Sequence, residues 1–335
     1  MVRYSQDRNK VALIHESGTY GITSGATGTG VWIGEITEHS ADDSENLIAD
    51  RFLGANTRSV AEWAGGPRDI NGTITFHPTD MRLLFWAIGS VNEAVGTGTA
   101  RIHYANQINT NVWQNPFCSG TGQINAPMSF ALEDSKTSAG SLFTRTIKGC
   151  VLDNVTLTAS QGEKVGIEAN YIAQNLAFSG GTSTLTVTVP TTTPYLWSDC
   201  SLTLSGITLA TAKEVSIAIN QNIEGPHYLN GSRDISAPIL GNRDNTLSVT
   251  MDLDEQAGNT IYSLYKNNAS FNSTFDLDAD STTGSQHTIL FMSGCKVNKM
   301  EVPSATEGVV ESTIEIVTPT IIGSSIDIIS AYNPW

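Results

Sequence analysis

Apolar and polar residues alternate over short stretches along most of the chain, and this period of two predicts β-strands. Glycine, asparagine, serine or proline bounds each stretch, and these residues favour turns. Many short strands of this kind are typical of antiparallel sandwiches and barrels. The clearest stretches are 72–76, 151–157, 165–171, 202–204, 215–219, 247–251, 288–291 and 309–317.

Two segments have the apolar spacing of a helix instead. Residues 78–89 begin with a proline, whose missing N–H is harmless in a first helical turn, and end at a glycine, which stops a helix. His77 precedes this segment, and we interpret it as a local capping residue. Residues 254–267 form the second predicted helix, with Asp254 as a plausible N-cap. One face of this helix would carry Ile261, Leu264 and Tyr265.

Four segments lack either pattern. Residues 1–30 are polar and end in a Gly/Thr-rich run, so we expect an N-terminal arm. Residues 39–50 are polar and acidic, which predicts a long loop. Residues 89–125 mix aromatic and polar residues and have no equivalent later in the chain, which indicates an insertion. Residues 179–194 are rich in Ser, Thr and Gly and read as a linker.

One motif occurs twice with the same internal spacing: Arg58-x7-Gly66-Pro67-Arg68-Asp69 and Arg233-x7-Gly241-Asn242-Arg243-Asp244. A Gly-Cys pair follows each copy, as Gly149-Cys150 and Gly294-Cys295, and opens an alternating strand. Two markers that recur in the same order predict a tandem duplication of one β-rich unit. The predicted boundaries are an arm (1–30), a first β domain (31–178), a linker (179–194), a second β domain (195–322) and a C-terminal tail (323–335).

The composition excludes several classes of protein. The chain has 335 residues, enough for two ordinary domains, and a formal net charge of -15. An acidic field repels nucleic acid, so a protein that clamps DNA is disfavoured. No apolar run approaches the length of a membrane span, and the first residues lack the apolar core of a signal peptide. These features favour synthesis in a reducing cytoplasm, with cysteines such as Cys150 and Cys295 as buried thiols.

The repeated arginines are the most informative charged residues. Arg58, Arg68, Arg233 and Arg243, with Asp69 and Asp244, are candidates for a subunit interface, because Arg forks onto carboxylates in two parallel bonds. The alternatives are salt bridges within one domain or a solvated loop. Either way, the motif indicates contacts rather than catalysis.

Three further aspartates, Asp276, Asp278 and Asp280, would share one face of a strand. Their spacing resembles the start of a calcium loop, but the glycine and the final glutamate of such a loop are missing. We therefore expect an acidic strip, solvated or facing a channel, in place of a metal site. The chain contains no nucleophile elbow, phosphate loop or dinucleotide fingerprint, so neither an enzyme nor a cofactor is indicated.

In combination, these features resemble the tail tube (major tail) proteins of long-tailed viruses, both bacteriophages and archaeal viruses. The resemblance covers most of residues 11–320 and rests on the order of elements in both halves. The segments that carry it are 16–21, 32–34, the Arg58 motif with 72–76, the Pro78-Thr79-Asp80 helix start, 215–222 and the two Gly-Cys strands.

The resemblance implies two tail-tube-like β-barrel or sandwich domains, each with one flanking helix. Hairpins of neighbouring subunits would join around a channel, and a duplicated chain would form a homotrimer with pseudo-six-fold symmetry. Such rings stack into a tube, with the N-terminal arm and residues 35–57 reaching the next ring. Expected partners are further copies, the tape measure, terminator and tip proteins, and DNA that passes through without specific binding during genome ejection.

A second hypothesis stays open from the residues alone. A baseplate or tail-tip protein, or a carbohydrate-binding β-sandwich, would also be β-rich and would use aromatic side chains to stack on sugars. Trp63, Trp113 and Trp197 are candidates for that role, although lone tryptophans usually serve cores. A β-rich hydrolase ranks below both.

Overall fold

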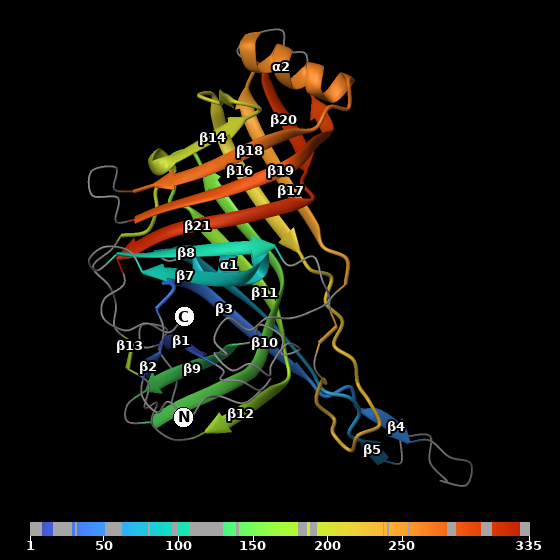
Figure 1. Cartoon of the computed structure of the whole chain (residues 1–335). Helices are drawn as coiled ribbons and strands as arrows, with labels where there is room; N and C mark the ends of the chain where they lie inside the picture. Colours follow the sequence, from blue (N-terminus) through green and yellow to red (C-terminus); the bar gives the residue numbers. More distant parts are fainter. Residues whose placement is uncertain are drawn as a thin grey trace.

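The computed structural model shows a mainly β protein with two α-helices, α1 (Arg82–Ile88) and α2 (Glu255–Lys266), in its described part (Figure 1). The residues outside this part include most of the predicted arm and residues 96–99 and 108–125 of the predicted insertion. The structure describes residues 9–15, 29–30, 32–50, 62–79, 81–95, 100–107, 130–138, 141–179, 186–187, 193–236, 238–239, 241–253, 255–279, 286–302 and 310–328.

The strands divide between the two halves of the chain. Those of the first half are β1 (Asn9–His15), β2 (Thr29–Gly30), β3 (Gly34–Ser44), β4 (Ile48–Asp50), β5 (Glu62–Ala64), β6 (Asp69–Pro78), β7 (Gly89–Val95), β8 (Ala100–Gln107), β9 (Phe130–Ser138), β10 (Ser141–Ser160), β11 (Gly166–Ala173) and β12 (Asn175–Ser179). After β13 (Thr186–Val187), those of the second half are β14 (Cys200–Leu204), β15 (Ile207–Thr208), β16 (Ala212–Asn220), β17 (Asp244–Asp252), β18 (Phe271–Asp278), β19 (Gln286–Glu301), β20 (Glu311–Val317) and β21 (Thr320–Ile328).

The pairing of strands is the same in both halves. In the first, β3 pairs with β6, β6 with β11, and β11 with β10, while β10 also pairs with β9 and β12 and β9 pairs with β1. The second repeats this as β16–β17–β20–β19, with β19 also pairing with β18 and β21, and β18 with β14. The long strands β10 and β19 each belong to two sheets.

Irregularities in the ladders recur at matching positions. The β3–β6 ladder shifts register between Ile36 and Glu38, and the β16–β17 ladder shifts between Ala212 and Glu214. Gly149 and Gly294 both have positive φ, at 65° and 71°. Each glycine breaks the ladder of its long strand beside a buried cysteine. Cys150 and Cys295 are buried and are not joined in a disulfide, as expected from the sequence. These matches give a residue-by-residue correspondence between the halves.

Two ladders join the halves. The last seven residues of β10, 154–160, pair with 214–220 of β16, so β3-β6-β11-β10-β16-β17-β20-β19 form one continuous eight-stranded sheet. We call the β10–β16 ladder the seam. On the other side of the molecule, the β7–β8 hairpin extends the second half's β18–β19–β21 sheet through β8–β21 pairing (Figure 1).

The interior between the sheets is apolar over most of its extent, but one buried cluster in the first half is polar. Arg145 donates to a carboxylate oxygen of Asp134 at 2.6 Å, and both residues come from directly paired positions of β10 and β9. The His39 ring lies 2.9 Å from the hydroxyl of Tyr171, which in turn donates to Ser40 O. The matching positions of the second half are Val215, Phe275, Leu290 and Ile316, all buried and apolar.

The structure corrects three expectations from the sequence. Residues 9–15 form β1, whose Leu13 is 1% exposed, and are therefore not part of an arm. Residues 39–44 belong to β3 and not to a loop: they pair with residues 69–74 of β6, and the half-buried His39 and Ala41 alternate with the exposed Ser40 and Asp42. The first helix begins at Arg82 because β6 continues through Pro78. His77 lies in that strand, with Nδ1 3.0 Å from Val165 O, and does not cap the helix.

Other expectations are confirmed. The strand at 72–76 lies within β6, and the second helix spans 255–266 with Ile261 buried. Tyr265, expected on the same face, is 43% exposed, and the expected N-cap Asp254 lies outside the described residues. The predicted insertion contains the β7–β8 hairpin, while its remainder from 108 lies outside the described residues. The mainly β class is therefore confirmed. The division into two barrel or sandwich domains stays a prediction.

Candidate assembly surfaces

Each half carries a hairpin arm, and a copy of the repeated motif forms the base of each arm. We call this base the neck. In the first copy, the side-chain amide of Asn46 donates to Pro67 O and to Asp69 Oδ2. In the second, Asn222 donates in the same way to Asn242 O and Asp244 Oδ2. Both asparagines have positive φ, which asparagine tolerates better than most residues. Each motif aspartate therefore accepts a hydrogen bond that holds the two chain segments of its neck together.

The motif glycines allow these necks to close. A Cβ on Gly66 would lie 2.0 Å from Asn46 O, and one on Gly241 would lie 2.2 Å from Asn222 O. No side chain fits at such distances, so both positions require glycine. The sequence repeat identified the glycines and aspartates, but it missed the asparagines. The sequence could have indicated these asparagines, since each one follows the end of the strand that leads into its arm.

The two copies of the motif meet at the first half's neck. Arg233, the first residue of the second copy, donates from Nε to Gly66 O at 2.8 Å, and its own carbonyl accepts the N–H of Arg68 at 2.9 Å. His227 Nε2 lies 2.9 Å from Asp69 Oδ1. The second half's arm, residues 221–243, thus lies against the first half's neck. Arg58 lies outside the described residues.

Arg68 and Arg243 occupy matching positions in different surroundings. Arg68 forms a two-bonded pair with Asp43, at 2.7 Å and 2.6 Å, and these hydrogen bonds raise the pKa of Arg68 and lower that of Asp43. Arg243 donates to Ile88 O at 2.7 Å, and burial lowers its pKa. The counterpart of Asp43 is Ile219, which has no carboxylate. Arg243 therefore pairs with a backbone carbonyl in place of an acidic side chain.

One face of the eight-stranded sheet is polar across the whole molecule. Pairs such as Ser40–Thr73, Asn154–Asn220 and Ser248–Glu315 place their side chains on this face, because directly paired residues point the same way. Carboxylates outnumber lysines on it, so its field is acidic. The carboxylates are Glu38, Asp42, Glu168, Glu214, Asp244, Asp252, Glu301, Glu311 and Glu315.

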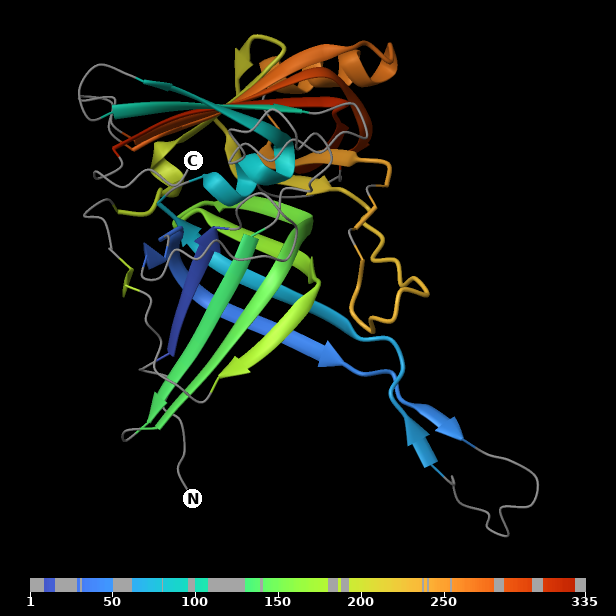
Figure 2. The ribbon, with the colours of Figure 1, turned by 60° about the horizontal axis from the view of Figure 1, so that its bottom comes forward.

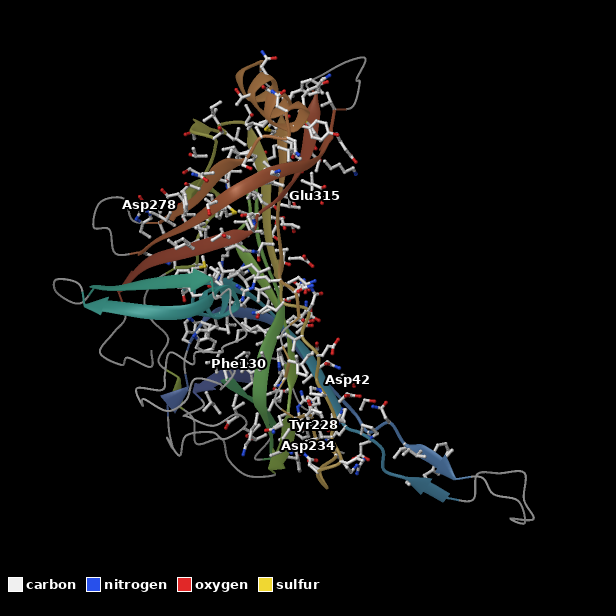
Figure 3. The ribbon with its side chains drawn as sticks, turned by 45° about the vertical axis from the view of Figure 1, so that its right-hand side comes forward. Asp42, Phe130, Tyr228, Asp234, Asp278 and Glu315 are labelled. Carbon is white, nitrogen blue, oxygen red and sulfur yellow. The ribbon has the colours of Figure 1, made fainter. Side chains whose placement is uncertain are left out.

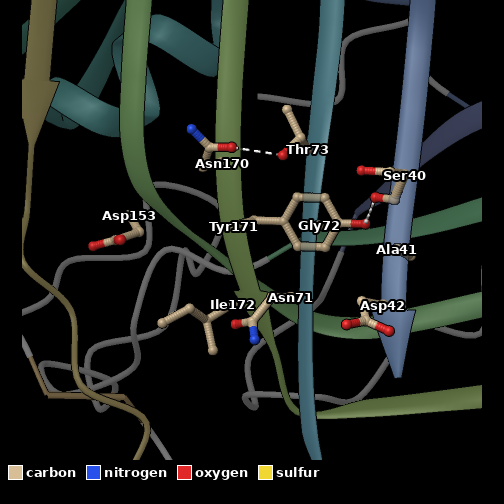
Figure 4. Close-up of a pocket in the computed structure, with 10 residues that line it drawn as sticks. All are labelled: Ser40, Ala41, Asp42, Asn71, Gly72, Thr73, Asp153, Asn170, Tyr171 and Ile172. Atoms are coloured by element: carbon tan, nitrogen blue, oxygen red, sulfur yellow. Dashed lines mark hydrogen bonds between the residues drawn. The ribbon is translucent and has the colours of Figure 1, made fainter. Parts of the chain in front are cut away.

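A hollow of about 450 Å³ lies on this face between β3, β6 and β11 (Figure 4). Its lining is polar, with Thr73 donating to Asn170 Oδ1 at 2.6 Å. Beneath it, Tyr171 occupies the space that a side chain at Gly72 would need, since a Cβ there would lie 2.2 Å from the tyrosine hydroxyl. Nothing in this lining resembles a catalytic set.

The aspartates expected to form an acidic strip are not among the carboxylates of the polar face. Asp276 and Asp278 are on β18, which is not a strand of the eight-stranded sheet, and Figure 3 places Asp278 on the opposite side of the molecule from Asp42 and Glu315. Asp276 Oδ1 lies 2.6 Å from His287 Nε2. Asp280 lies outside the described residues. The polar face therefore carries a different set of carboxylates from the one singled out in the sequence.

The remaining chemistry-bearing groups give no sign of catalysis. Among the described residues, no three His, Cys, Asp or Glu side chains gather as a metal site would require. Burial raises the pKa of Cys200 to about 12, so its sulfur is a thiol and not a nucleophilic thiolate at neutral pH. Trp63 and Trp197 are 58% and 44% exposed, and Trp113 lies outside the described residues.

Comparison with known families fits a protein built to contact its own copies. The family model described as phage tail tube protein matches residues 6–321, nearly the whole chain. The chain belongs to the phage tail tube protein family. No curated protein is similar enough to count as a relative. As a tail tube protein it is a structural component of the virion tail.

Family membership has an implication for assembly. A tail tube protein assembles with its own copies and with other tail components. Neither described helix has the length and apolar character to cross a membrane.

Proposed function

We propose that three copies of this tail tube protein close into a ring of pseudo-six-fold symmetry, that the rings stack into the tail tube, and that the bore conducts the viral genome into the host cell. In this proposal each half of the chain is one tail-tube-like domain, so three chains supply six. A ring closes when each subunit offers one surface to its neighbour's different surface.

The observation that carries the proposal is the seam. The edge of β10 in the first half pairs with β16 in the second, and the matching strands β19 and β3 stand at the two ends of the eight-stranded sheet. Within the described residues, β3 pairs only with β6, and residues 299–301 of β19 pair only with β20. An open edge is a template for another strand. Pairing of β19 with β3 of the next chain would repeat the seam between subunits.

The correspondence between the halves gives the register of that contact. Asn154 pairs with Asn220 at the seam, and their counterparts are Lys299 and Ser44. The following pair, Val155 with Ile219, corresponds to Met300 with Asp43. Glu301 would then face Asp42 directly, and Lys299, which pairs with Glu301 in its own strand, would stand diagonally across from Asp42 and offset the like charges of these two carboxylates.

The polar face of the sheet is the natural wall of the bore. Its opposite face packs on the core, so only the polar face can line an open channel. Phosphate binding needs neutralisation by Lys or Arg, and a wall dominated by carboxylates would let DNA pass without adhesion. Other tail proteins, such as the tape measure, terminator and tip, would meet the ends of the stack.

Oxidative cross-linking of a Ser44→Cys/Lys299→Cys chain tests the proposal. Directly paired strand residues lie about 4.5–5.5 Å apart between their Cα atoms, a distance that suits a disulfide. We expect covalent dimers and trimers on a non-reducing gel, with no species beyond the trimer. Negative-stain electron microscopy of the same sample should show three-chain rings or hollow tubes.

The matched control is Asn154→Cys/Asn220→Cys, which places the same bond at the seam within one chain. This variant should become oxidised without any increase in mass. If the control is oxidised and the Ser44/Lys299 variant stays monomeric, or forms a ladder past the trimer, the proposed ring is wrong. Discrete monomers at every concentration would also contradict the tube.

A further inference from the structure

The two helices lie at matching positions but are covered differently. Counting from Asp69 and Asp244 places Trp86 of α1 at the position of Ile261 in α2, and both side chains are buried. α1 packs on β10 on one side and on β7, β8 and β21 on the other, so it closes one side of the second half (Figure 2). α2 packs on β19, the strand that matches β10, but its other side is open, and Tyr262 there is 51% exposed.

Within the chain, the contact between α1 and β21 combines one large and one small residue. The ring of Phe85 lies against Gly323 of β21, where a Cβ would lie 2.7 Å from a ring carbon. The position of Phe85 corresponds to Thr260 in α2. The position of Gly323 corresponds to Phe178 in β12, because Gly323 pairs with Leu290 of β19 and Phe178 pairs with the matching residue of β10. The large side chain therefore changes from the helix to the strand.

The first half is open where α1 closes the second. Phe178 is 63% exposed, although its side chain is on the face of the sheet that points inward. Its ring packs against that of Phe143, with centroids 4.9 Å apart, and Phe143 is only half-buried, whereas the matching Thr288 is fully buried. Leu176 is half-buried, and its counterpart Ile321 is buried. An apolar side of the first half thus lacks the cover that a helix gives the second.

The end of α1 is held by the second half's neck. Gln221 donates from its side-chain amide to Ala87 O at 3.1 Å, and Arg243 donates to Ile88 O at 2.7 Å. The last carbonyls of a helix have no partner inside it, so these two donors satisfy them. The half that α1 covers therefore contacts both the side and the end of the helix.

The first half's neck has matching residues that suit α2. This helix continues for another turn, in which Ser263 O accepts the N–H of Asn267 at 3.0 Å, so no outside donor is needed there. The neck position of the amide donor is held by Glu45, whose carboxylate is 53% exposed and lies 3.4 Å from the Arg233 guanidinium. The last turn of α2 carries the exposed cation Lys266. The neck and the helix end thus have complementary charges.

We infer that α2 of one chain docks on the open side of the first half of a neighbouring chain, with Thr260 against Phe178 and Lys266 beside Glu45. This inference rests on the proposed ring, and it identifies the partner of α2 as a second copy within that ring. Pairing of β19 with the neighbour's β3 would bring α2, which packs on β19, beside the neighbour's first half. Each half then closes the side of the half that follows it.

An exchange of the two side chains tests the contact. Thr260→Phe puts two rings into the space for one, and Phe178→Gly leaves that space empty, so we expect each to raise the concentration needed for ring formation about tenfold. The double variant Thr260→Phe/Phe178→Gly repeats the pair that α1 and β21 form, so it should assemble at a concentration well below that of Thr260→Phe. Sedimentation across a dilution series measures this. A double variant that assembles no better than Thr260→Phe overturns the pairing.

The reverse exchange within the chain is the matched control. Gly323→Phe should lower the melting temperature of the dilute monomer because the added ring meets Phe85, and Phe85→Thr/Gly323→Phe should recover part of the loss. Phe178→Thr removes the ring but keeps a residue that favours strands, so it should weaken assembly at an unchanged melting temperature. Phe291→Thr, which removes a ring that is 37% exposed on the outward face of β19, should change neither.

The unmodified chain separates this inference from the proposed function. If it forms no rings at any concentration, the proposed function fails. If it forms rings, and Thr260→Phe and Phe178→Thr form them at the same concentration, the ring stands and the docking of α2 is wrong.

Discussion

The two halves of the chain share one strand order but fill the same part of their interiors differently. The first half holds the ion pair Arg145–Asp134 where the second holds Leu290 packed beside Phe275, at directly paired strand positions in both cases. The neighbouring His39 and Tyr171 likewise correspond to Val215 and Ile316. Strand order therefore depends on the alternation of inward and outward positions. It is compatible with a polar interior as well as an apolar one.

The difference also shows what each interior requires. The apolar interior of the second half gains stability from burial and close packing alone. The polar one must satisfy every group, because a buried charge without its partner is costly. The side chain of Asp134 is 3% exposed, and that of Arg145 is 19% exposed. We expect the first half to be the more sensitive to single substitutions at this position.

The largest effect should come from Asp134→Ala, which leaves the Arg145 guanidinium without its carboxylate. Removing one partner of a buried pair costs about 3–5 kcal/mol. Denaturant unfolding of the monomer measures the loss. Transplanting the second half's residues, as Asp134→Phe/Arg145→Leu, should recover most of it because apolar groups of similar volume replace buried pairs well. A transplant as unstable as Asp134→Ala would show that the halves are not interchangeable here.

A smaller effect is expected from Gly72→Ala. The added Cβ would lie 2.2 Å from the Tyr171 hydroxyl, and overpacking of this kind costs about 1–3 kcal/mol. The second half has Leu247 and Ile316 at these positions, which share the space more evenly. Adding Tyr171→Ile to Gly72→Ala should therefore restore part of the melting temperature. An unchanged melting temperature in Gly72→Ala would contradict the close contact.

The smallest expected effect depends on pH and is confined to the first half. The hydrogen bond from Arg68 lowers the pKa of Asp43 below its ordinary value of 3.8. A carboxyl whose folded pKa is lowered contributes stability above its unfolded pKa and loses it as the pH falls through the folded value. Asp43→Asn should cost about 1 kcal/mol at neutral pH, since the pair is partly exposed.

The difference between Asp43→Asn and the unmodified chain should shrink as the pH drops below about 4. Unfolding free energies at a series of pH values would measure it. The second half offers no such response at the matching position, because Ile219 cannot titrate. A difference that persists at pH 2 would mean that Asp43 acts through packing instead of charge.

The sequence was sufficient for the features that repeat. The Arg-x7-Gly motif and the Gly-Cys pairs mark necks and ladder breaks, both of which depend on the absence of a side chain or on a local backbone conformation. Strand alternation was also readable wherever the inward residues were apolar. The family resemblance followed from the order of these local signals.

What the sequence did not reveal depends on contacts between distant residues. The sequence predicts a loop for residues 39–44 of β3, because carboxylates are frequent there and the inward residues include His39, whose partner Tyr171 is 132 positions away. The contact between Arg233 and Gly66 spans 167 positions. The predicted interface role of Arg68, Asp69, Arg233, Arg243 and Asp244 between subunits stays a prediction, although Arg68 and Arg233 already meet within one chain.

The β7–β8 hairpin has a consequence for symmetry. It widens the second half's sheet by two strands, and the matching edge of the first half, β12, receives no such addition in the described part of the chain. In a ring of three chains, the bore would repeat nearly every sixty degrees, while the outer wall would repeat only every one hundred and twenty. A protein that wraps the tube from outside would then have three equivalent binding positions per ring. The genome inside would pass a wall that lacks this three-fold difference.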